Sequence, residues 1–216
     1  MKVALIGASG FVGKAVLKEL VNRNHQVIAI ARNPENIESL PDTDPVAADV
    51  TNPDDVAKAV AGSDAVISAF NAGWTNPNLY ADFLAGSKAI QAGVKKSGVK
   101  RLIVVGGAGS LYVASGVQLV DTPQFPAEYK AGATSARDYL NVLKEENELD
   151  WTFFSPAIEM HQGTSGVRKG TYRTALENPV FDANNRSILS VEDLAVALVD
   201  EVENPQHVKQ RFTAAY

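Results

Sequence analysis

The sequence predicts an α/β fold in which a parallel sheet is doubly wound, with helices on both faces. Short apolar runs such as Val3–Ile6 alternate along the chain with stretches of helical spacing, such as Val12–Val21. Runs that are apolar throughout are typical of strands buried on both faces. The alternation is regular as far as Pro156, and after it residues 157–189 lack a comparable pattern. We therefore expect a small C-terminal lobe beside the sheet.

Each predicted element rests on its own pattern of apolar residues. Strands are predicted at Val3–Ile6, Val27–Ala31, Val46–Val50, Ala65–Phe70, Arg101–Val105, Trp151–Phe154 and Arg211–Ala215, the third of them weakly. Helices are predicted over Val12–Val21, about Pro53–Ala61, Leu79–Val94 and around Ala136–Leu143, and strand-like pieces at Thr171–Ala175 and Ser187–Leu189. A last helix is expected to begin at Ser190, where the hydroxyl caps the first turn and Asp193 reaches back to complete a capping box.

Length and composition limit the classes of protein that fit. A chain of 216 residues suits one domain, residues 1–216, with 157–189 as its lobe, since no linker precedes that segment. Cysteine is absent, and the histidines His25, His161 and His207 lack metal-ligand spacing, so no metal site is expected. A net charge of −5 with scattered basic residues argues against a nucleic-acid partner. The sequence offers no membrane-spanning stretch and no export signal, which predicts a cytoplasmic protein.

A glycine-rich turn follows the first strand. Its sequence, Gly7-Ala8-Ser9-Gly10-Phe11-Val12-Gly13, has the spacing G-x-x-G-x-x-G between a strand and a helix. Glycines there permit a tight turn, a close approach of the backbone to a diphosphate, and close packing of helix on strand. The predicted fold is therefore Rossmann-type, and the predicted diphosphate-binding residues are Gly7, Ser9, Gly10, Phe11 and Val12. A phosphate-binding P-loop is rejected, because Ala8 stands where its first glycine is required and Ala15 replaces its hydroxyl.

The end of the second strand indicates which dinucleotide is bound. An NAD-selective site usually carries Asp or Glu there, to accept a hydrogen bond from the ribose 2′-hydroxyl. This sequence has no carboxylate there, and Arg32 follows. A guanidinium pairs well with a 2′-phosphate, so NADP(H) is favoured over NAD(H); the alternative is a solvated arginine just past the end of the strand. The adenine is expected beside Asp49 and Val50. Ala69, Phe70 and Asn71 are expected to border the same crevice, at the end of the fourth strand.

Longer stretches carry a resemblance to a known family. They are Gly7–Gly13, Val104–Leu111, Asp150–Ala157, Gly170–Arg173 and Ile188–Ala195. With these stretches, in family order, the chain is similar to the atypical short-chain dehydrogenase/reductase superfamily. It resembles in particular the NAD(P)-binding branch of bacterial NADH-flavin reductases, which is related to NmrA-like proteins and flavin/biliverdin reductases. The glycine turn is shared by a wide superfamily, whereas Gly-Gly-Ala-Gly-Ser and Asp-Trp-Thr are much narrower motifs.

The resemblance implies an NAD(P)H-dependent oxidoreductase that transfers hydride to a flavin or quinone-like acceptor, with the flavin a substrate rather than a bound group. It implies that Gly106 and Gly107 lie beside the nicotinamide and that Ser110 hydrogen-bonds the substrate. The implied partner is a small-molecule acceptor, with no nucleic acid and no membrane, for a chain that is a monomer or a homodimer. Residues 157–189 then form the substrate-side lobe.

One feature of the superfamily is missing. Many members carry Tyr-x-x-x-Lys, in which the lysine lowers the tyrosine pKa so that the phenol exchanges a proton near neutral pH. No tyrosine here has a lysine four residues later. Tyr129 and Lys130 lie near the expected place and are kept, with Ser110, as catalytic candidates. Hydride transfer to a flavin or quinone needs no such pair, because the acceptor is already electrophilic and solvent supplies the proton.

Further candidates on the substrate side have structural alternatives. His161 is either catalytic or an ordinary loop residue, and Trp74 either stacks on an acceptor ring, as Phe70 also would, or fills the core. Three basic residues form a local cluster that either holds a flavin phosphate or is solvated: Arg168, Lys169 and Arg173. Two rival functions stay open. One is an NADP(H)-binding redox sensor of NmrA-like type without turnover, which the missing pair supports equally well. The other is a nucleotide-sugar epimerase or dehydratase, which the missing pair disfavours.

Overall fold

A computed structural model describes residues 1–216 and places eight strands in one sheet. The strand order is β3-β2-β1-β4-β5-β8-β10-β9, and neighbouring strands are parallel except β10 with β9. The strands are β1 (Lys2–Ile6), β2 (Gln26–Ala31), β3 (Thr43–Ala47), β4 (Ala65–Ser68), β5 (Arg101–Val105), β8 (Asp150–Ser155), β9 (Arg173–Ala175) and β10 (Gln210–Ala215). Two short strands, β6 (Tyr112–Ala114) and β7 (Val117–Gln118), form a separate hairpin that the sequence prediction lacks.

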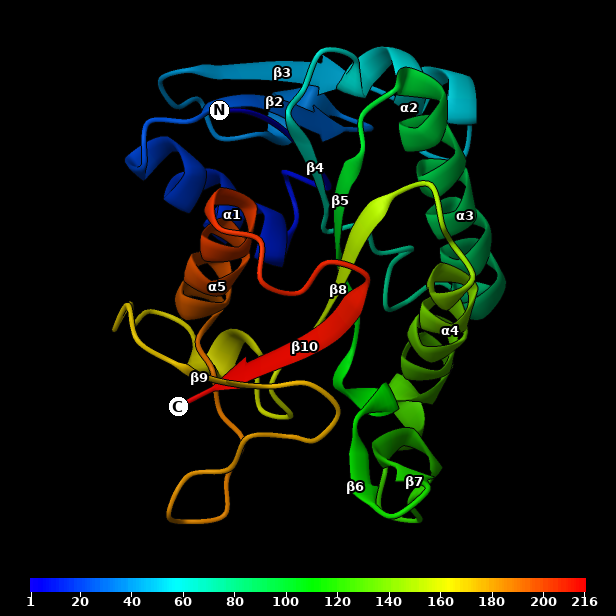
Figure 1. The fold of residues 1–216 in the computed structure, drawn as a ribbon, viewed down its shortest axis with the longest axis vertical. Helices are drawn as coiled ribbons and strands as arrows, with labels where there is room; N and C mark the ends of the chain where they lie inside the picture. Colours follow the sequence, from blue (N-terminus) through cyan, green and yellow to red (C-terminus); the bar gives the residue numbers. More distant parts are fainter.

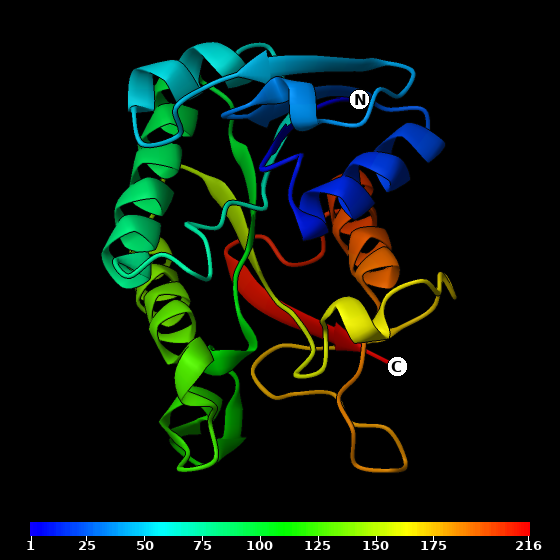
Figure 2. The same ribbon diagram turned by 180° about the vertical axis from the view of Figure 1, so that it is seen from behind.

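Helices cover both faces of the sheet (Figures 1 and 2). α1 (Phe11–Asn22) and α5 (Val191–Glu203) pack side by side on one face, and α2 (Pro53–Val60), α3 (Leu79–Ser97) and α4 (Ala127–Lys144) follow one another on the other face. Single turns of 3₁₀ helix are η1 (Pro34–Asn36), η2 (Ala108–Ser110), η3 (Leu119–Asp121) and η4 (Gln162–Thr164). The predicted Rossmann-type, doubly wound fold is thereby confirmed. No helix combines the length and the apolar character needed to cross a membrane.

The central strands are apolar throughout because each contributes to two cores. Every residue of β4 and β5 is buried. Alternate side chains of a strand point to opposite faces. Leu5 and Phe154 therefore enter the core beneath α1 and α5, whereas Ile6 and Phe153 enter the core beneath α2, α3 and α4. A strand covered on both sides has no polar face to expose, which explains the continuous apolar runs.

Two predicted strands have wrong boundaries, the third at both ends and the fourth at its carboxyl end. The third strand is Thr43–Ala47 rather than Val46–Val50. It is an edge strand with exposed side chains and contains Pro45, so no apolar run marks it. The fourth strand ends at Ser68 rather than Phe70. Residues 49–50 and 69–70 therefore lie in loops just beyond the strands.

The segment of residues 157–189 is joined to the main sheet. The predicted piece Thr171–Ala175 corresponds to β9, which pairs with β10 at the edge of the sheet. The predicted piece Ser187–Leu189 contains only a single bridge, between Ile188 and Glu159. The segment thus takes its position from the pairing of β9 with β10 and from side-chain contacts.

The first turn of α5 holds part of this segment. Ser190 Oγ accepts a hydrogen bond from the Asp193 amide at 3.0 Å, as predicted. The buried Asp193 carboxylate does not return to the Ser190 amide. It accepts instead from the amides of Lys169 and Gly170, at 2.9 and 2.7 Å, and from the Tyr216 hydroxyl. The second half of the predicted capping box is therefore wrong, because two amides of the segment satisfy this carboxylate.

Charged side chains join the same segment to α1 and α5. Glu19 is only 3% exposed and accepts from Arg168 Nε and Nη2 at 2.9 and 2.7 Å and from Arg23 Nε at 2.8 Å. Arg23 also donates to Asp200 and Glu203, at 2.6 and 2.8 Å. We call these five residues the Glu19 cluster. The hydrogen bonds from Arg168, reinforced by Arg23, lower the pKa of Glu19 although burial opposes them.

Replacing Glu19 by Gln is expected to lower the free energy of unfolding at neutral pH by about 1–3 kcal/mol, because two guanidinium groups lose the buried charge that they share. Folding lowers the pKa of Glu19, so its charge stabilises the protein above its ordinary pKa of 4.5, and this contribution is lost as the pH falls through the folded pKa. In urea unfolding, the difference between E19Q and the unmodified protein should therefore shrink below pH 4.5.

The matched control is Glu35→Gln, which removes an exposed carboxylate that forms no ion pair. This variant should unfold like the unmodified protein at every pH. A destabilisation of E19Q that stays the same from neutral to acidic pH would contradict an ionic role for the Glu19 cluster.

Candidate functional site

The strand order brings the predicted dinucleotide-binding residues together at the carboxyl ends of the central strands. We call this region, from the glycine turn to Arg32, Asp49–Val50 and Ala69–Asn71, the dinucleotide edge. β1 lies between β2 and β4, and the chain winds outward from these strands in opposite directions. Such a switch point, at the carboxyl ends of the strands, is where open α/β sheets bind ligands. The glycine turn leaves β1 here, and its Gly7 and Ala8 amides donate to Ile30 O of β2 at 2.9 and 3.2 Å. On the other side the Ala69 amide donates to Ile6 O at 2.9 Å.

The glycines of this turn are required by close backbone packing. Gly7 has a φ of +81°, and a Cβ built on it would lie 2.6 Å from Ala69 O. A Cβ on Gly13 would lie 2.0 Å from Gly7 O. Gly10 closes the turn by donating to Gly7 O at 3.0 Å. The start of α1 is therefore packed directly onto the end of β1, at a distance that no larger residue permits.

The first amides of α1 are left without partners. Gly10 is the N-terminal cap and offers no side-chain hydrogen bond, and the first turn holds no acidic residue. The amides of Ser9, Phe11 and Val12 donate to no group of the protein. In contrast, α2 and α5 are capped by side chains, and α3 and α4, which lack such a cap, carry Asp82 and Glu128 in their first turns. Unpaired amides at the positive end of a helix dipole suit an anion, so these residues fit the diphosphate of a dinucleotide.

Arg32 and Asp49 lie together beyond β2 and β3. Arg32 is exposed and forms neither an ion pair nor a side-chain hydrogen bond. Asp49 Oδ1 accepts from the hydroxyl and the amide of Thr51 at 2.7 and 2.9 Å. These two hydrogen bonds, followed by the charge of Arg32, lower the pKa of Asp49. An unpaired guanidinium and the free carboxylate oxygen of Asp49 are thus available at the end of this edge.

Two predicted members of the edge contribute mainly to packing. The Phe70 ring stacks on Phe83 with centroids 5.8 Å apart, and a Cβ on Gly86 would lie 2.6 Å from it. Val50 is 8% exposed and belongs to the core beneath α2 and α3. Asn71, by contrast, is exposed, and its Oδ1 accepts from the Gly73 amide at 2.7 Å.

The end of β5 is also shaped by residues without side chains. A Cβ on Gly106 would lie 1.9 Å from the Phe153 ring, and one on Gly107 would lie 3.6 Å from Ala136 of α4. Both glycines are partly exposed. The backbone at Gly106 therefore packs directly on the Phe153 ring, where only glycine fits.

The structure buries Ser110 more deeply than the predicted contact with substrate requires. Ser110 is 1% exposed, and Arg211 of β10 donates to its carbonyl oxygen and its Oγ at 2.8 and 3.0 Å. The same guanidinium pairs with Glu177 and lies beside the ring of Tyr112. Ser110 thereby connects the β5–α4 connection to the 157–189 segment, a geometry that favours a structural role. Sequence reasoning did not find Arg211, whose only signal is a charge at the start of an apolar strand.

Tyr129 and Lys130 lie in the first turn of α4. Tyr129 is 50% exposed, and Lys130 is exposed and forms no ion pair. The residue four positions after Tyr129 is Ala133, whose Cβ lies 2.8 Å from where a Cβ of Gly109 would be. The lysine position of the usual pair is therefore filled by a methyl group packed on η2. No lysine is positioned to activate the tyrosine.

The weaker candidates of the 157–189 segment have structural partners. His161 caps η4, where its Nδ1 accepts from the Gly163 amide at 3.0 Å. Arg168 belongs to the Glu19 cluster, Lys169 Nζ lies 3.5 Å from the centroid of the Tyr216 ring, and Arg173 donates to backbone oxygens. The three basic residues point to different partners and do not form a common anion site.

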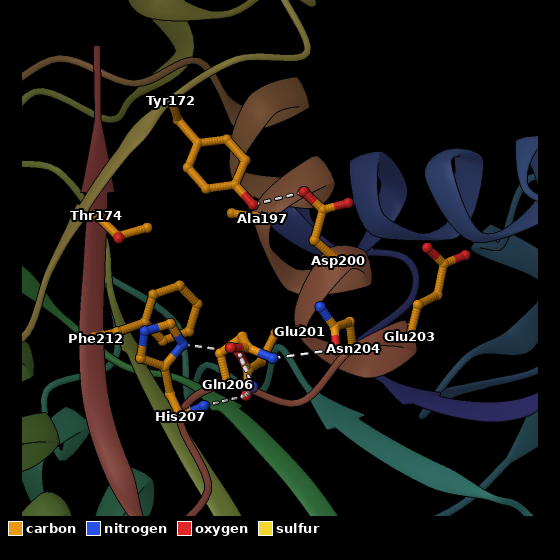
Figure 3. Close-up of a pocket in the computed structure, with 10 residues that line it drawn as sticks. All are labelled: Tyr172, Thr174, Ala197, Asp200, Glu201, Glu203, Asn204, Gln206, His207 and Phe212. Carbon is orange, nitrogen blue, oxygen red and sulfur yellow. Dashed lines mark hydrogen bonds and ion pairs between the residues drawn. The ribbon is translucent and has the colours of Figure 1, made fainter.

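Two cavities lie away from the glycine turn. Figure 3 shows one of about 400 Å³, between the second half of α5 and the amino end of β10. Its polar groups are largely paired with one another: Tyr172 donates to Asp200 at 2.5 Å, and His207 Nδ1 lies 2.8 Å from Glu201. The other cavity, of about 430 Å³, lies within the 157–189 segment, where Lys169 is one of the residues that line it. Neither includes a residue of the dinucleotide edge.

Comparisons with known proteins place the chain among NAD(P)H-binding proteins. The model of the NAD(P)H-binding family matches residues 7–205. A solved structure from Bacteroides thetaiotaomicron, provisionally described as an epimerase, is 44% identical with a TM-score of 0.91 and covers 100% of this chain and 96% of its own. A Burkholderia pseudomallei protein, provisionally described as exported, is 42% identical with a TM-score of 0.86 over 100% of both chains. A Streptococcus pneumoniae TIGR4 protein, provisionally described as an NADH-flavin reductase, is 35% identical with a TM-score of 0.83 over 100% of this chain and 99% of its own.

The family match begins at the first glycine of the turn and continues into the loop after α5, so it covers both the dinucleotide edge and the 157–189 segment. The chain belongs to the NAD(P)H-binding family, which agrees with its resemblance to the atypical short-chain dehydrogenase/reductase superfamily.

Proposed function

We propose that the protein is an NADPH-dependent reductase that transfers hydride to a flavin or quinone-like acceptor. The observation that carries the first part is the set of unpaired amides at Ser9, Phe11 and Val12, at a helix start without an acidic residue. The unpaired Arg32 beside Asp49 supports the preference for a 2′-phosphate. The cofactor itself supplies the hydride.

In this proposal the chain binds and orients rather than exchanges protons. The amides of the glycine turn hold the diphosphate, Arg32 pairs with the 2′-phosphate, and the free oxygen of Asp49 accepts from the adenine amino group. Gly106 and Gly107 are assigned to the nicotinamide ring, and Gly106 is required there because a side chain would collide with the buried Phe153 ring. Holding the ring and the acceptor in register is the main contribution of the protein to the rate.

The choice of acceptor follows from the missing proton-transfer pair. An epimerase or alcohol dehydrogenase needs a tyrosine activated by a lysine, and Ala133 occupies the lysine position. A flavin or quinone accepts hydride without that help, and the Streptococcus relative is provisionally described as an NADH-flavin reductase. The Bacteroides relative described as an epimerase makes a sugar nucleotide the weaker alternative. An NmrA-like sensor, which binds the dinucleotide without turnover, is the rival that the same absence supports.

The predicted setting is one domain that works as a monomer or homodimer in the cytoplasm, with residues 157–189 covering the acceptor. A relative from Burkholderia is provisionally described as exported, so fractionation of the native host is the measurement that decides the compartment.

Steady-state oxidation of NADPH should proceed with FMN or menadione as acceptor, at a rate well above that of the free reagents. Absorbance at the nicotinamide band is the measurement. If the folded protein binds NADPH tightly but oxidises none of it with either acceptor, the reductase proposal fails and the sensor takes its place.

Replacing Arg32 by Ala should raise the KM for NADPH about tenfold or more, since a charge-assisted pair with the 2′-phosphate is worth about 1.5–3 kcal/mol. The KM for NADH should change less than about twofold, because NADH has no phosphate there. Lys58→Ala is the matched control, since Lys58 is an exposed cation of α2 that forms no ion pair. Equal losses for both dinucleotides in R32A would show that Arg32 does not select NADPH.

A further inference from the structure

Two aromatic side chains stand exposed next to each other where the core does not need them. Trp74, in the loop between β4 and α3, is 59% exposed, and Tyr129, in the first turn of α4, is 50% exposed. Their ring centroids are 5.6 Å apart, with planes at 87°. The other tryptophan of the chain, Trp151, is 3% exposed and belongs to the core beneath α3 and α4. Large apolar rings left in water mark a surface that a partner can cover.

The Trp74 ring packs against α4 at Gly132. A Cβ on Gly132 would lie 2.8 Å from its Cζ3 and 3.2 Å from its Cη2, so the indole rests against bare helix backbone. The loop that carries it is closed by hydrogen bonds from the Gly73 amide to Asn71 Oδ1 at 2.7 Å and from the Asn76 amide to Gly73 O at 3.0 Å. A ring that already packs against the helix loses little side-chain entropy when a second ring stacks on it.

The position of the pair relates it to the end of β5. Gly132 lies one helical turn before Ala136, about 6 Å along α4. Ala136 is the residue that packs on Gly107, and Ala133 packs on Gly109. Figure 2 shows the loop after β4 running beside α3 and α4. The two rings therefore border the part of the sheet edge where the proposed function puts the nicotinamide.

We propose that Trp74 and Tyr129 form a stacking surface for the planar conjugated ring of the hydride acceptor, an isoalloxazine or a quinone. The inference rests on the proposed function and goes beyond it by naming the acceptor-binding residues and the shape they select. Aromatic faces attract flat conjugated rings. The two side chains together expose on the order of 200 Å², which suits one small ring system and is far below the roughly 800 Å² that a protein partner covers in a stable complex.

Binding of riboflavin, which has the ring system but no phosphate, tests this surface independently of turnover. The full chain, saturated with NADP⁺, is titrated with riboflavin, and the quenching of riboflavin emission gives the Kd. Trp74→Leu should raise this Kd about tenfold or more, whereas Trp74→Phe, which keeps a ring, should raise it no more than about threefold. Tyr129→Leu should weaken binding in the same direction, and Tyr129→Phe should bind like the unmodified protein.

Tyr80→Leu is the matched control, because Tyr80 is an aromatic residue of similar exposure, 40%, that contacts Asp138 farther along α4. Its Kd should be unchanged, and the melting temperature of W74L should stay within a few degrees. Equal riboflavin affinity in W74L and the unmodified protein would overturn the proposal. So would a W74L variant that changes the oligomeric state instead, since the rings would then belong to a protein interface.

The proposed function can fail separately. Riboflavin binding that depends on Trp74 in a protein that does not oxidise NADPH would support the stacking surface and refute the reductase. Turnover with FMN that is untouched in W74L would support the reductase and refute the stacking surface.

Discussion

The packing of α1 onto the end of β1 is the constraint on which the dinucleotide edge depends. The carbonyl oxygen of Gly7 accepts from Gly10 and lies 2.0 Å from where a Cβ of Gly13 would be, so the helix begins within the turn itself. Because that start has no side-chain cap, the amides of Phe11 and Val12 have no partner. The same turn is hydrogen-bonded to β2, and the loop after β4 bonds to β1, which fixes the neighbouring parts of the edge around it.

Residues 157–189 are held to the rest of the protein by different interactions. The β1–α1 turn is built from glycines and backbone amides, whereas residues 157–189 are held by charged side chains. Asp193 binds two amides of that segment, Glu19 binds Arg168, and Arg211 pairs with Glu177 while holding Ser110. Ionic contacts of this kind contribute little net stability but fix one arrangement strongly, since removing either partner leaves a charge unsatisfied.

The fold was predictable because its strands are buried on both faces and its helices are amphipathic. The glycine turn was predictable as well, because its glycine spacing lies directly between a strand pattern and a helix pattern. The edge strand β3 was misplaced because its exposed residues and Pro45 leave no pattern. The burial of Ser110 could not be inferred, because it depends on Arg211, which is about a hundred residues away in sequence and reaches it only after β10 joins the sheet. Long-range pairing of single polar residues leaves no periodicity in one sequence.

The different exposure of Trp74 and Phe70 also depends on contacts that form only in the folded chain. Both are aromatic residues of the loop between β4 and α3, and the sequence alone does not indicate which of them is buried. Gly86 and Phe83 draw Phe70 into the packing of α3, whereas Gly132 gives Trp74 a flat support that leaves much of its ring in water. Phe70 packs at Gly86 of α3 and Trp74 packs at Gly132 of α4, and these contacts between distant residues cannot be inferred from one sequence.

Amide chemical shifts measure the central claim most directly. In ¹H–¹⁵N spectra of the ¹⁵N-labelled protein, saturating NADP⁺ should shift the amides of Ser9, Phe11 and Val12 strongly, because unpaired donors gain charged acceptors. Saturation with NADP⁺ that leaves these three amides unmoved, while signals elsewhere shift, would contradict the account of the β1–α1 turn as the diphosphate site.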